Sequence, residues 1–337
     1  MAICRVYLLT YHRNNLLPRA LNSLLNQSLK DWVCELHNDA PEDGFPSKLV
    51  EKINDPRISM VNHQKNLGGT KSFNIAFKEV PEPFVSILED DNWWEPHFLS
   101  RMVEEINKFP DVRLAWANMQ LWQEDENGAW VNTGRCINEA SEKDVPKLFY
   151  WPEKRQINGA IHSIGAVLMR SKDIGDFSIP HSTLLDSIEP VRERAFEYPI
   201  LFVPQVLANF SMTVKTFRSQ NIFSYLQTQI LLLGTFFKHM PAKEKFLNEF
   251  VSESRSQFPR STSVIIFAAF LLPECRKLFK YVTGGDWMFF ILSFLKHPLL
   301  FLKLFKAIPM NKEVFEFLDK NTALRLAQAK KYGFNSL

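Results

Sequence analysis

The sequence predicts an α/β fold in which a mostly parallel sheet is flanked by helices and is followed by a helical C-terminal region. In the first hundred residues, short apolar runs alternate with stretches whose apolar residues recur at helical spacing. From about residue 219 onward the pattern is helical and rich in phenylalanine. We therefore expect an α/β domain over residues 1–215 and an α-helical region over residues 216–337.

The composition is that of a globular protein. The chain has 337 residues, of which 46% are hydrophobic and 23% are charged, and its formal net charge of +3 is too small to indicate nucleic acid as a partner. Its four cysteines lie far apart without a CxxC pair, which argues against zinc and a disulfide scaffold and favours a reducing cytosol. We expect the N-terminus to be a strand, not a signal peptide, and no apolar run reaches the ~20 residues of a spanning helix.

Polar residues follow several of the predicted strands. Strands are expected at residues 6–9, 32–36, 58–62 and 85–88, with helices at 14–26, at 47–54 and from about 70 to 77. Parallel sheets bind ligands at the carboxyl ends of their strands, where the strand order switches. The polar residues 10–13, 38–39 and 89–91 are placed at such ends. The sequence therefore predicts a ligand site there.

The acidic run at residues 89–91 indicates which ligand this is. Carboxylates are hard oxygen ligands that suit Mg²⁺ or Mn²⁺, and these ions usually bridge to substrate phosphates. The chain has no GxxxxGK[ST] or GxGxxG loop, and Gly68-Gly69 is the only early glycine pair. These observations favour a nucleotide diphosphate neutralised by a metal ion. The alternative is a solvated acidic turn after a strand.

Several segments of the first hundred residues occur in an order and spacing typical of one family. They are TYHR at residues 10–13, SLLNQ at 23–27, NDAPED at 38–43, NLGGTKSFN at 66–74 and LEDDNWWEP at 88–96. Together they resemble the family 2 glycosyltransferases, which are nucleotide-sugar enzymes of the GT-A fold. The chain departs from the family pattern at His12, Asn38, Glu89 and Asn92.

The resemblance implies roles for individual residues. Asp39 would accept a hydrogen bond from the nucleobase, Lys71 would support the nucleotide, and Asp90 would lie near the ribose. Asp91 would ligate the metal. The resemblance further implies that the nucleotide site includes Thr10, Tyr11 and Arg13.

Further side chains are candidates for contacts with sugar or acceptor. Trp93 and Trp94 could both stack on sugar faces; Trp94 matches the family pattern, and core packing is the alternative for Trp93. His162 would contact a diphosphate oxygen or the acceptor. The alternative for His162 is a core histidine whose hydrogen bonds are satisfied.

Inverting transfer needs a carboxylate that removes the proton of the acceptor hydroxyl. In the family an acidic residue opens a helix in this region, with an arginine about two turns later, and Asp186 and Arg192 fit that spacing. We expect Asp186 to be the general base, with Glu189 as the reserve. The alternative is that Asp186 only caps the following helix.

The segment at residues 287–308 reads as a basic amphipathic helix. Ser293, Lys296, His297, Lys303 and Lys306 would lie near one stripe, and Pro298 would kink or divide the helix. Such a helix lies in a membrane interface. Nearby positive charge is expected from Arg276, Lys277 and Lys280. The alternative is a helix that packs on the catalytic domain.

These patterns together predict a metal-dependent, inverting glycosyltransferase that uses Mn²⁺ or Mg²⁺. It would move a sugar from a nucleotide diphosphate donor, a UDP-sugar above all, to a glycan or lipid-linked glycan, as in bacterial surface polysaccharide synthesis. The expected location is cytoplasmic, peripheral on the inner face of the cell membrane. The alternatives are a non-catalytic sugar-nucleotide-binding or membrane-docked protein, and a nucleotidyltransferase, for which residues 10–14 lack the basic glycine-rich phosphate loop.

Overall fold

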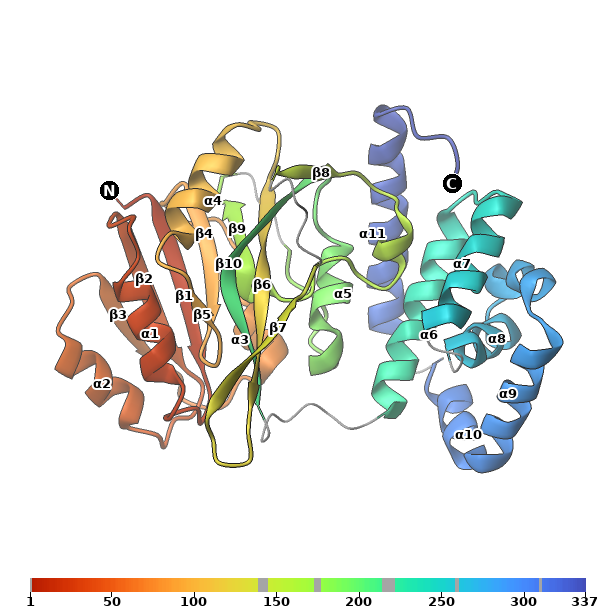
Figure 1. Cartoon of the computed structure of the whole chain (residues 1–337), viewed down its shortest axis with the longest axis horizontal. Coiled ribbons are helices and arrows are strands. Elements are labelled where there is room, and N and C mark those ends of the chain that lie inside the picture. Colours follow the sequence, from red (N-terminus) through yellow and green to blue (C-terminus); the bar gives the residue numbers. More distant parts are fainter. Residues whose placement is uncertain (1, 139–144, 173–176, 214–221, 258–260, 309–310) are drawn as a thin grey trace. The chain divides into compact units, whose positions relative to one another are not determined.

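The computed structural model describes the chain except for residues 1, 139–144, 173–176, 214–221, 258–260 and 309–310. The chain folds into two compact units, drawn in Figure 1. Unit 1 is formed by Met1–Phe149, Ile161–Ser178 and Phe196–Phe217, and unit 2 by Tyr150–Ala160, Ile179–Ala195 and Arg218–Leu337. The chain thus leaves unit 1 and returns to it twice before the long helical segment begins.

Unit 1 is an α/β unit built on one sheet. Its strands are β1 (Cys4–Thr10), β2 (Trp32–Asn38), β3 (Ile58–Asn62), β4 (Phe84–Glu89), β5 (Trp93–Trp94), β6 (Leu114–Glu124), β7 (Trp130–Cys136), β8 (Lys147–Phe149), β9 (Val167–Arg170) and β10 (Ile200–Met212). Its helices are α1 (Leu17–Leu25), α2 (Phe45–Ile53), α3 (Gly69–Asn74), α4 (Phe98–Asn107) and the short 3₁₀ turn η2 (Ile164–Ala166). The strands predicted in the first hundred residues are confirmed to within two residues at each end.

The sheet is mixed, with a parallel N-terminal half. The strand order is β3-β2-β1-β4-β9-β6-β10-β5, while β7 pairs with β6 and β8 with β10. Strands β3, β2, β1 and β4 are parallel, whereas β9 runs antiparallel to both β4 and β6. The predicted fold class is therefore confirmed, and the parallel order ends where β9 inserts. Strand β1 has β2 on one side and β4 on the other, so the strand order switches at β1.

Alternating side chains of β1 build the core beneath α1. Cys4, Val6 and Leu8 face the same side of the sheet and are fully buried in one cluster with Leu17 and Leu21 of α1. Helices α2 and α4 add apolar residues to this cluster, so they cover the same face of the sheet as α1 (Figure 1). Burial of this face fixes the register of the strands and therefore the position of their polar ends.

Unit 2 is helical. Its elements are the 3₁₀ turns η1 (Lys154–Ile157), η3 (Leu185–Ser187) and η4 (Pro273–Tyr281), and the helices α5 (Ile188–Glu193), α6 (Ile222–His239), α7 (Glu244–Gln257), α8 (Ser261–Leu271), α9 (Gly284–Lys296), α10 (Pro298–Ala307) and α11 (Lys312–Lys331). Helix α6 packs against α11, α8 and α10. The buried Arg194 ties the unit together, since it donates to the carbonyl of Ile157 at 2.7 Å and to Thr322 Oγ1 at 2.9 Å.

The segment predicted as one amphipathic helix at residues 287–308 is two helices. Pro298 opens α10, and the chain bends by 94° between α9 and α10. The predicted division at Pro298 is confirmed, but the predicted single polar stripe is wrong because the bend separates Lys296 from Lys303 and Lys306. Among the helices within the described residues, none is long and apolar enough by itself to cross a membrane, while the bent α9–α10 pair reaches that length and apolar content together.

Candidate functional site

Polar side chains gather where β1, β2 and β4 end. The register pairs Thr10 with Asn38 and Leu9 with Glu89, so the carboxyl ends of these parallel strands lie at the same edge of the sheet. We call this the polar edge, and its residues are Thr10, Asn38, Asp39, Glu89, Asp90 and Asp91. It lies at the switch in strand order, the usual position of ligands in open α/β sheets.

Asp90 points inward at the polar edge. Its Oδ2 accepts a hydrogen bond from the backbone N–H of Tyr11 at 3.1 Å, which links the ends of β4 and β1. Burial and the neighbouring Asp91 carboxylate raise the pKa of Asp90 to about 7. Near neutral pH this carboxyl group is therefore close to half protonated. It joins the two strand ends.

Glu89 is held inside unit 1. Its Oε2 accepts hydrogen bonds from Asn92 Nδ2 at 2.6 Å and from Ser163 Oγ at 2.8 Å. A Cβ at Gly165 would lie 2.4 Å from the same oxygen, so the carboxylate needs a glycine there. Glu89 and Asn92 are two of the departures from the family pattern, and they contact each other. The longer glutamate arm is thus directed to an internal partner.

Asp91 is the carboxylate of the acidic run that is best placed for a ligand. Its backbone carbonyl accepts from Arg19 Nη2 at 2.7 Å and from the hydroxyl of Ser211, which fixes the main chain. Its side chain is 18% exposed and has Arg13 Nη1 at 3.5 Å from Oδ2. A cation and a carboxylate therefore lie side by side at the polar edge, where both are partly exposed to solvent.

The polar edge can be tested for its fit to a metal ion. Within the part of the chain that the structure describes, no group of three or more His, Cys, Asp or Glu residues could hold a metal alone. Mg²⁺ is usually bound by one or two carboxylates together with substrate phosphates, and Mn²⁺ accepts the same oxygen ligands. The Asp91 carboxylate fits this mode, in which the ion arrives with a diphosphate.

Asp39 organises the loop that leads into α3. Its Oδ1 accepts from the N–H of Leu67 at 2.7 Å, and its Oδ2 accepts from the N–H of Gly68 at 3.2 Å and from Ser72 Oγ at 2.9 Å. Gly68 has φ of +79°, a conformation that favours glycine. The loop is therefore shaped around the Asp39 carboxylate. It presents Lys71, which is exposed.

The remaining predicted nucleotide residues lie at the end of β1. Thr10 is buried and its carbonyl accepts from the N–H of Asp39 at 3.0 Å. Tyr11 is 49% exposed and its ring contacts that of His12 edge-on. His12 has φ of +54°, which is unusual for a residue with a side chain, and such strain is common at ligand sites. His12 Nε2 lies 3.0 Å from Glu42.

Trp94 does not have the position that was predicted for it. The side chain is 2% exposed, its ring stacks on Phe98 at 4.2 Å, and its indole N–H donates to the carbonyl of Gly165 at 2.7 Å. Neighbouring residues of a strand point to opposite faces, and Trp94 points into the core. The prediction that Trp94 stacks on a sugar is therefore wrong in this structure.

Trp93 is the partly exposed member of the pair and belongs to a cluster that the sequence did not reveal. The guanidinium of Arg19 lies 3.9 Å from the ring centre of Trp93 and 4.3 Å from that of Trp130. Burial lowers the pKa of Arg19 to about 10. The same guanidinium donates to the Asp91 carbonyl, so the cluster supports the main chain of the acidic run. The sequence feature that could have indicated this cluster is Arg19, the one arginine in the largely apolar helix α1.

The Ser-x-x-x-Gln segment of α1 holds the chain that follows the acidic run. Ser23 Oγ accepts from the N–H of Trp94 at 3.1 Å. Gln27 donates to the carbonyl of Glu95 at 2.8 Å and accepts from the N–H of Leu99 at 3.0 Å. These residues of the family pattern therefore have a structural role here, since they position the segment after Asp91.

His162, which also belongs to unit 1, is exposed, and its ring meets Phe210 edge-on with ring centres 4.8 Å apart. It is therefore not a buried core histidine. Its exposed ring leaves the predicted contact with diphosphate or acceptor open as a prediction.

The predicted base region belongs to unit 2. Asp186 lies in the 3₁₀ turn η3, and its side chain is outside the described residues. The N-cap of α5 is Ser187, so Asp186 is one residue before the capping position. Glu189 lies in the first turn of α5 and is half-buried, and Arg192 is fully buried.

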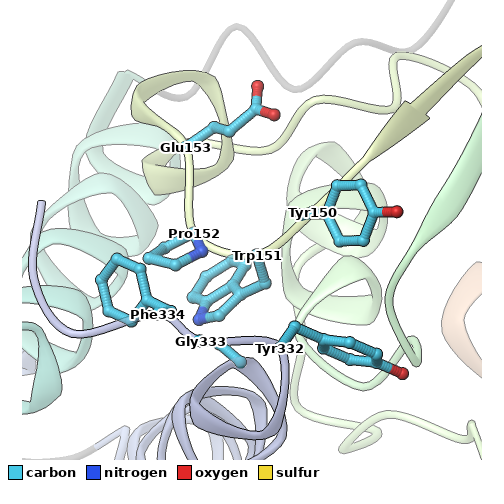
Figure 2. Close-up of a pocket in the computed structure, with 8 residues that line it drawn as sticks. Tyr150, Trp151, Pro152, Glu153, Tyr332, Gly333 and Phe334 are labelled. Carbon is cyan, nitrogen blue, oxygen red and sulfur yellow. The ribbon is translucent and has the colours of Figure 1, made fainter.

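Unit 2 contains an open cavity of about 580 Å³, shown in Figure 2. Its lining residues are Tyr150, Trp151, Pro152, Glu153, Ala329, Tyr332, Gly333 and Phe334. The rings of Tyr150 and Tyr332 meet edge-on and both are largely exposed. The lining is aromatic and apolar with one carboxylate. It lacks the cations that a diphosphate needs, and so the polar edge is the better candidate for a nucleotide.

Comparison with known proteins agrees with this geometry. The family described as glycosyl transferase family 2 matches residues 6–164. WcaA of Escherichia coli K12, whose name assigns it to colanic acid biosynthesis as a glycosyl transferase, is 28% identical over 119 residues, which are 35% of this chain and 43% of WcaA. CgeD of Bacillus subtilis is 22% identical over 245 residues, 69% of this chain and 55% of CgeD. The chain thus covers less than two thirds of either protein.

The fold likeness extends over almost the whole chain. TarS 1–349 of S. aureus, solved in complex with UDP-GlcNAc, superposes with a TM-score of 0.58 at 13% identity, covering 99% of this chain and 91% of that one. The complex of the same protein with UDP gives a TM-score of 0.57 at 14% identity, covering 99% and 92%. Residues 6–164 thus match glycosyltransferase family 2, and the fold of the chain is GT-A.

Proposed function

We propose that this protein is a metal-dependent, inverting glycosyltransferase that uses a nucleotide diphosphate sugar. The observation that carries the proposal is the polar edge at the switch in strand order, where the Asp91 carboxylate lies beside Arg13. The match of residues 6–164 to a glycosyltransferase family supports the same chemistry. No glycine-rich phosphate loop is present in the sequence, which favours phosphate binding through a metal ion and cationic side chains.

A UDP-sugar is the proposed donor. The TarS structures of the same fold contain UDP and UDP-GlcNAc, which supports this choice. The proposed acceptor is a glycan or a lipid-linked glycan, as in bacterial surface polysaccharide synthesis, and the name of WcaA supports that class. A lipid-linked acceptor would require the enzyme to work at the inner face of the cell membrane.

The proposed reaction is a single displacement at the anomeric carbon. The acceptor oxygen forms a bond to that carbon while the bond to the diphosphate oxygen breaks, and the diphosphate leaves with the electron pair. Asp186 would take the proton of the acceptor hydroxyl, with Glu189 as the reserve. Asp91 would hold Mg²⁺ or Mn²⁺, and the bound ion supplies positive charge against the leaving diphosphate. The cations of Arg13 and Lys71 would bind the same phosphates.

A non-catalytic sugar-nucleotide binder is the second candidate. The contact between Glu89 and Asn92 favours it, because this pair turns one carboxylate of the acidic run away from a metal. Both candidates bind a nucleotide, and only the enzyme turns over a sugar donor.

The test combines binding and turnover. We expect UDP to raise the melting temperature more with Mn²⁺ than with a chelator, and Asp91→Asn to abolish that metal-dependent increment. The same variant should lose about 10²-fold or more in metal-dependent hydrolysis or transfer across a panel of UDP-sugars. Glu104→Gln is the control, since this carboxylate lies exposed on α4 in surface ion pairs.

Two results would contradict the proposal. An equal UDP shift with and without chelator would remove the metal from the mechanism. Binding of UDP-sugars without turnover of any member of the panel, with all acceptor classes supplied, would favour the non-catalytic binder.

A further inference from the structure

Helices α9 and α10 of unit 2 expose an apolar surface. We call it the α9–α10 apolar surface, and its residues are Met288, Phe289, Ile291, Leu292, Phe294, Leu295, Leu299, Leu302 and Phe305. Each of these side chains is between 42% and 71% exposed. Single exposed apolar residues are ordinary, but soluble proteins rarely expose so many along one short segment.

Apart from Phe294, whose ring centre lies 5.3 Å from that of Phe301, these residues form a second face, distinct from the face that packs inside unit 2. In α10 the buried side chains are Phe301 and Leu304, and the Phe301 ring meets that of Phe267 in α8. The exposed Leu302 and Phe305 follow these positions by one residue each, on a neighbouring stripe of the helix. The exposed apolar residues of α10 therefore lie outside this packed face and remain available for a partner.

The start of α9 is firmly anchored. The hydroxyl of Thr283 accepts from the N–H of Asp286, and the Asp286 carboxylate accepts from the N–H of Thr283 and from Arg255. Although burial opposes it, hydrogen bonds from Arg255 and Thr283 hold the pKa of Asp286 well below its usual range. The carboxylate of α9 is therefore ionised and neutralised within unit 2. It adds no free negative charge to the apolar surface.

The charges beside the apolar surface are positive. Lys296, Lys303 and Lys306 are exposed on α9 and α10. Two other lysines, which were predicted to add positive charge nearby, have partners within unit 2. Lys277 donates to the carbonyl of Phe237, and Lys280 pairs with Glu244. The charge of Lys280 is therefore balanced by Glu244, whereas the predicted cations Arg276 and Lys277 are exposed on η4 near α9 in sequence.

We propose that the α9–α10 apolar surface lies in the interface of an anionic lipid bilayer, with Lys296, Lys303 and Lys306 reaching the headgroups. Apolar side chains enter the acyl boundary while lysine stems extend to the lipid phosphates. A second copy of the chain fits less well, because symmetric pairing would bring the same lysines together as like charges. Anionic headgroups instead neutralise them. This surface is separate from the polar edge, so the inference stands independently of the proposed function.

The experiment is co-sedimentation of the full chain with vesicles. We expect binding to vesicles containing phosphatidylglycerol, weaker binding to pure phosphatidylcholine, and partial release at high salt. Leu295→Asp/Leu299→Asp should weaken binding to anionic vesicles about tenfold or more, because it places charge at the most exposed apolar positions. Lys303→Gln/Lys306→Gln should instead reduce the preference for anionic lipid and the salt dependence.

The matched control is Val131→Asp/Leu324→Asp, which introduces the same charge at exposed apolar residues outside this surface. It should bind vesicles like the unchanged chain, apart from a small general effect of charge. Far-UV circular dichroism and the UDP-dependent thermal shift should be unaltered in every variant. The proposal is overturned if the full chain stays in the supernatant with all vesicles, or if both aspartate pairs weaken binding equally. A dimer that Leu295→Asp/Leu299→Asp dissociates, without vesicle binding, would assign the surface to a second copy.

Discussion

The polar edge of unit 1 and the α9–α10 apolar surface of unit 2 depart from the usual burial pattern in opposite directions. At the polar edge, Asn38 is 1% exposed and Asp39 is 6% exposed, although both are polar. On the apolar surface, Leu295 is 69% exposed and Leu299 is 71% exposed. Buried polar groups and exposed apolar patches are the two observations that most often carry functional information.

The two regions differ in which contacts stabilise their unusual burial. Asp39 receives three hydrogen bonds from the loop that it organises, and Asp90 receives one from Tyr11, so both buried carboxyl groups have partners within unit 1. No described residue of unit 2 covers Leu295 and Leu299, which stay 69% and 71% exposed. The polar edge is therefore organised before a ligand arrives, whereas the apolar surface gains its stabilisation only from an external partner.

The largest effect is expected from Asp186, because it tests whether unit 2 contributes to the chemistry as well as to docking. Asp186→Asn keeps the size of the side chain but removes the base, so transfer should fall by about 10²–10⁴-fold. UDP affinity should be unchanged, since the nucleotide is proposed to bind at the polar edge of unit 1. Initial transfer rates and a UDP titration of the same preparation measure the two effects.

Glu189→Gln is the paired variant in the same region. It should retain most of the transfer activity if Asp186 is the base. Normal rates in Asp186→Asn with a large loss in Glu189→Gln would move the role to Glu189. Normal rates in both would confine the chemistry to unit 1.

The positions of the N-terminal strands along the chain could be predicted from sequence because each strand carries its own local signal. Apolar runs and helical spacing in the first hundred residues gave β1 to β4, and the polar ends of those strands follow from parallel pairing. The insertion of β9 between β4 and β6 has no such signal, because it depends on which strand edges are available in three dimensions. The order of the strands in the sheet therefore had to come from the structure.

At the candidate site, too, the sequence could not predict how individual side chains pack. Alternation in a strand says that Trp93 and Trp94 face opposite sides, but only the packing of Phe98 shows that Trp94 is the inner one. The contacts of Arg19 with Trp93 and Trp130 join residues far apart in the chain, so no local sequence pattern reveals them. Residue types at the polar edge were predictable, and their hydrogen-bond partners were not.

A second prediction sharpens the description of the polar edge through pH. The pKa of Asp90 is raised from 3.8 to about 7, so the folded chain binds an extra proton between these values and loses stability as the pH rises through them. Asp90→Asn removes this dependence and can still accept from Tyr11. Relative to the unchanged chain, the variant should gain about 3 kcal/mol between pH 5 and pH 8. Urea unfolding of both proteins at the two pH values measures the gain.

His37 does not affect the comparison between the unchanged chain and Asp90→Asn. Burial lowers the pKa of His37, so its contribution to stability is lost as the pH falls below about 6.5, opposite in sign to that of Asp90. The same histidine is present in both proteins and cancels in their difference. Parallel pH profiles for the two proteins would mean that Asp90 is ionised throughout, and the polar edge would then bury a full charge.

The smallest effect is expected from Arg19→Lys, which tests whether the cluster around Trp93 supports the acidic run. Lysine keeps the charge but loses the planar group that contacts two indole rings and binds the Asp91 carbonyl. The loss of stability should be about 1 kcal/mol, the usual scale of a cation–π contact. UDP affinity should fall severalfold, because the main chain of Asp91 loses a donor. Arg135→Lys, at an exposed position on β7, is the control and should change neither quantity. If Arg19→Lys also leaves UDP affinity unchanged while lowering stability, the cluster supports the fold alone, and the position of Asp91 is fixed by Ser211 and the strand ends.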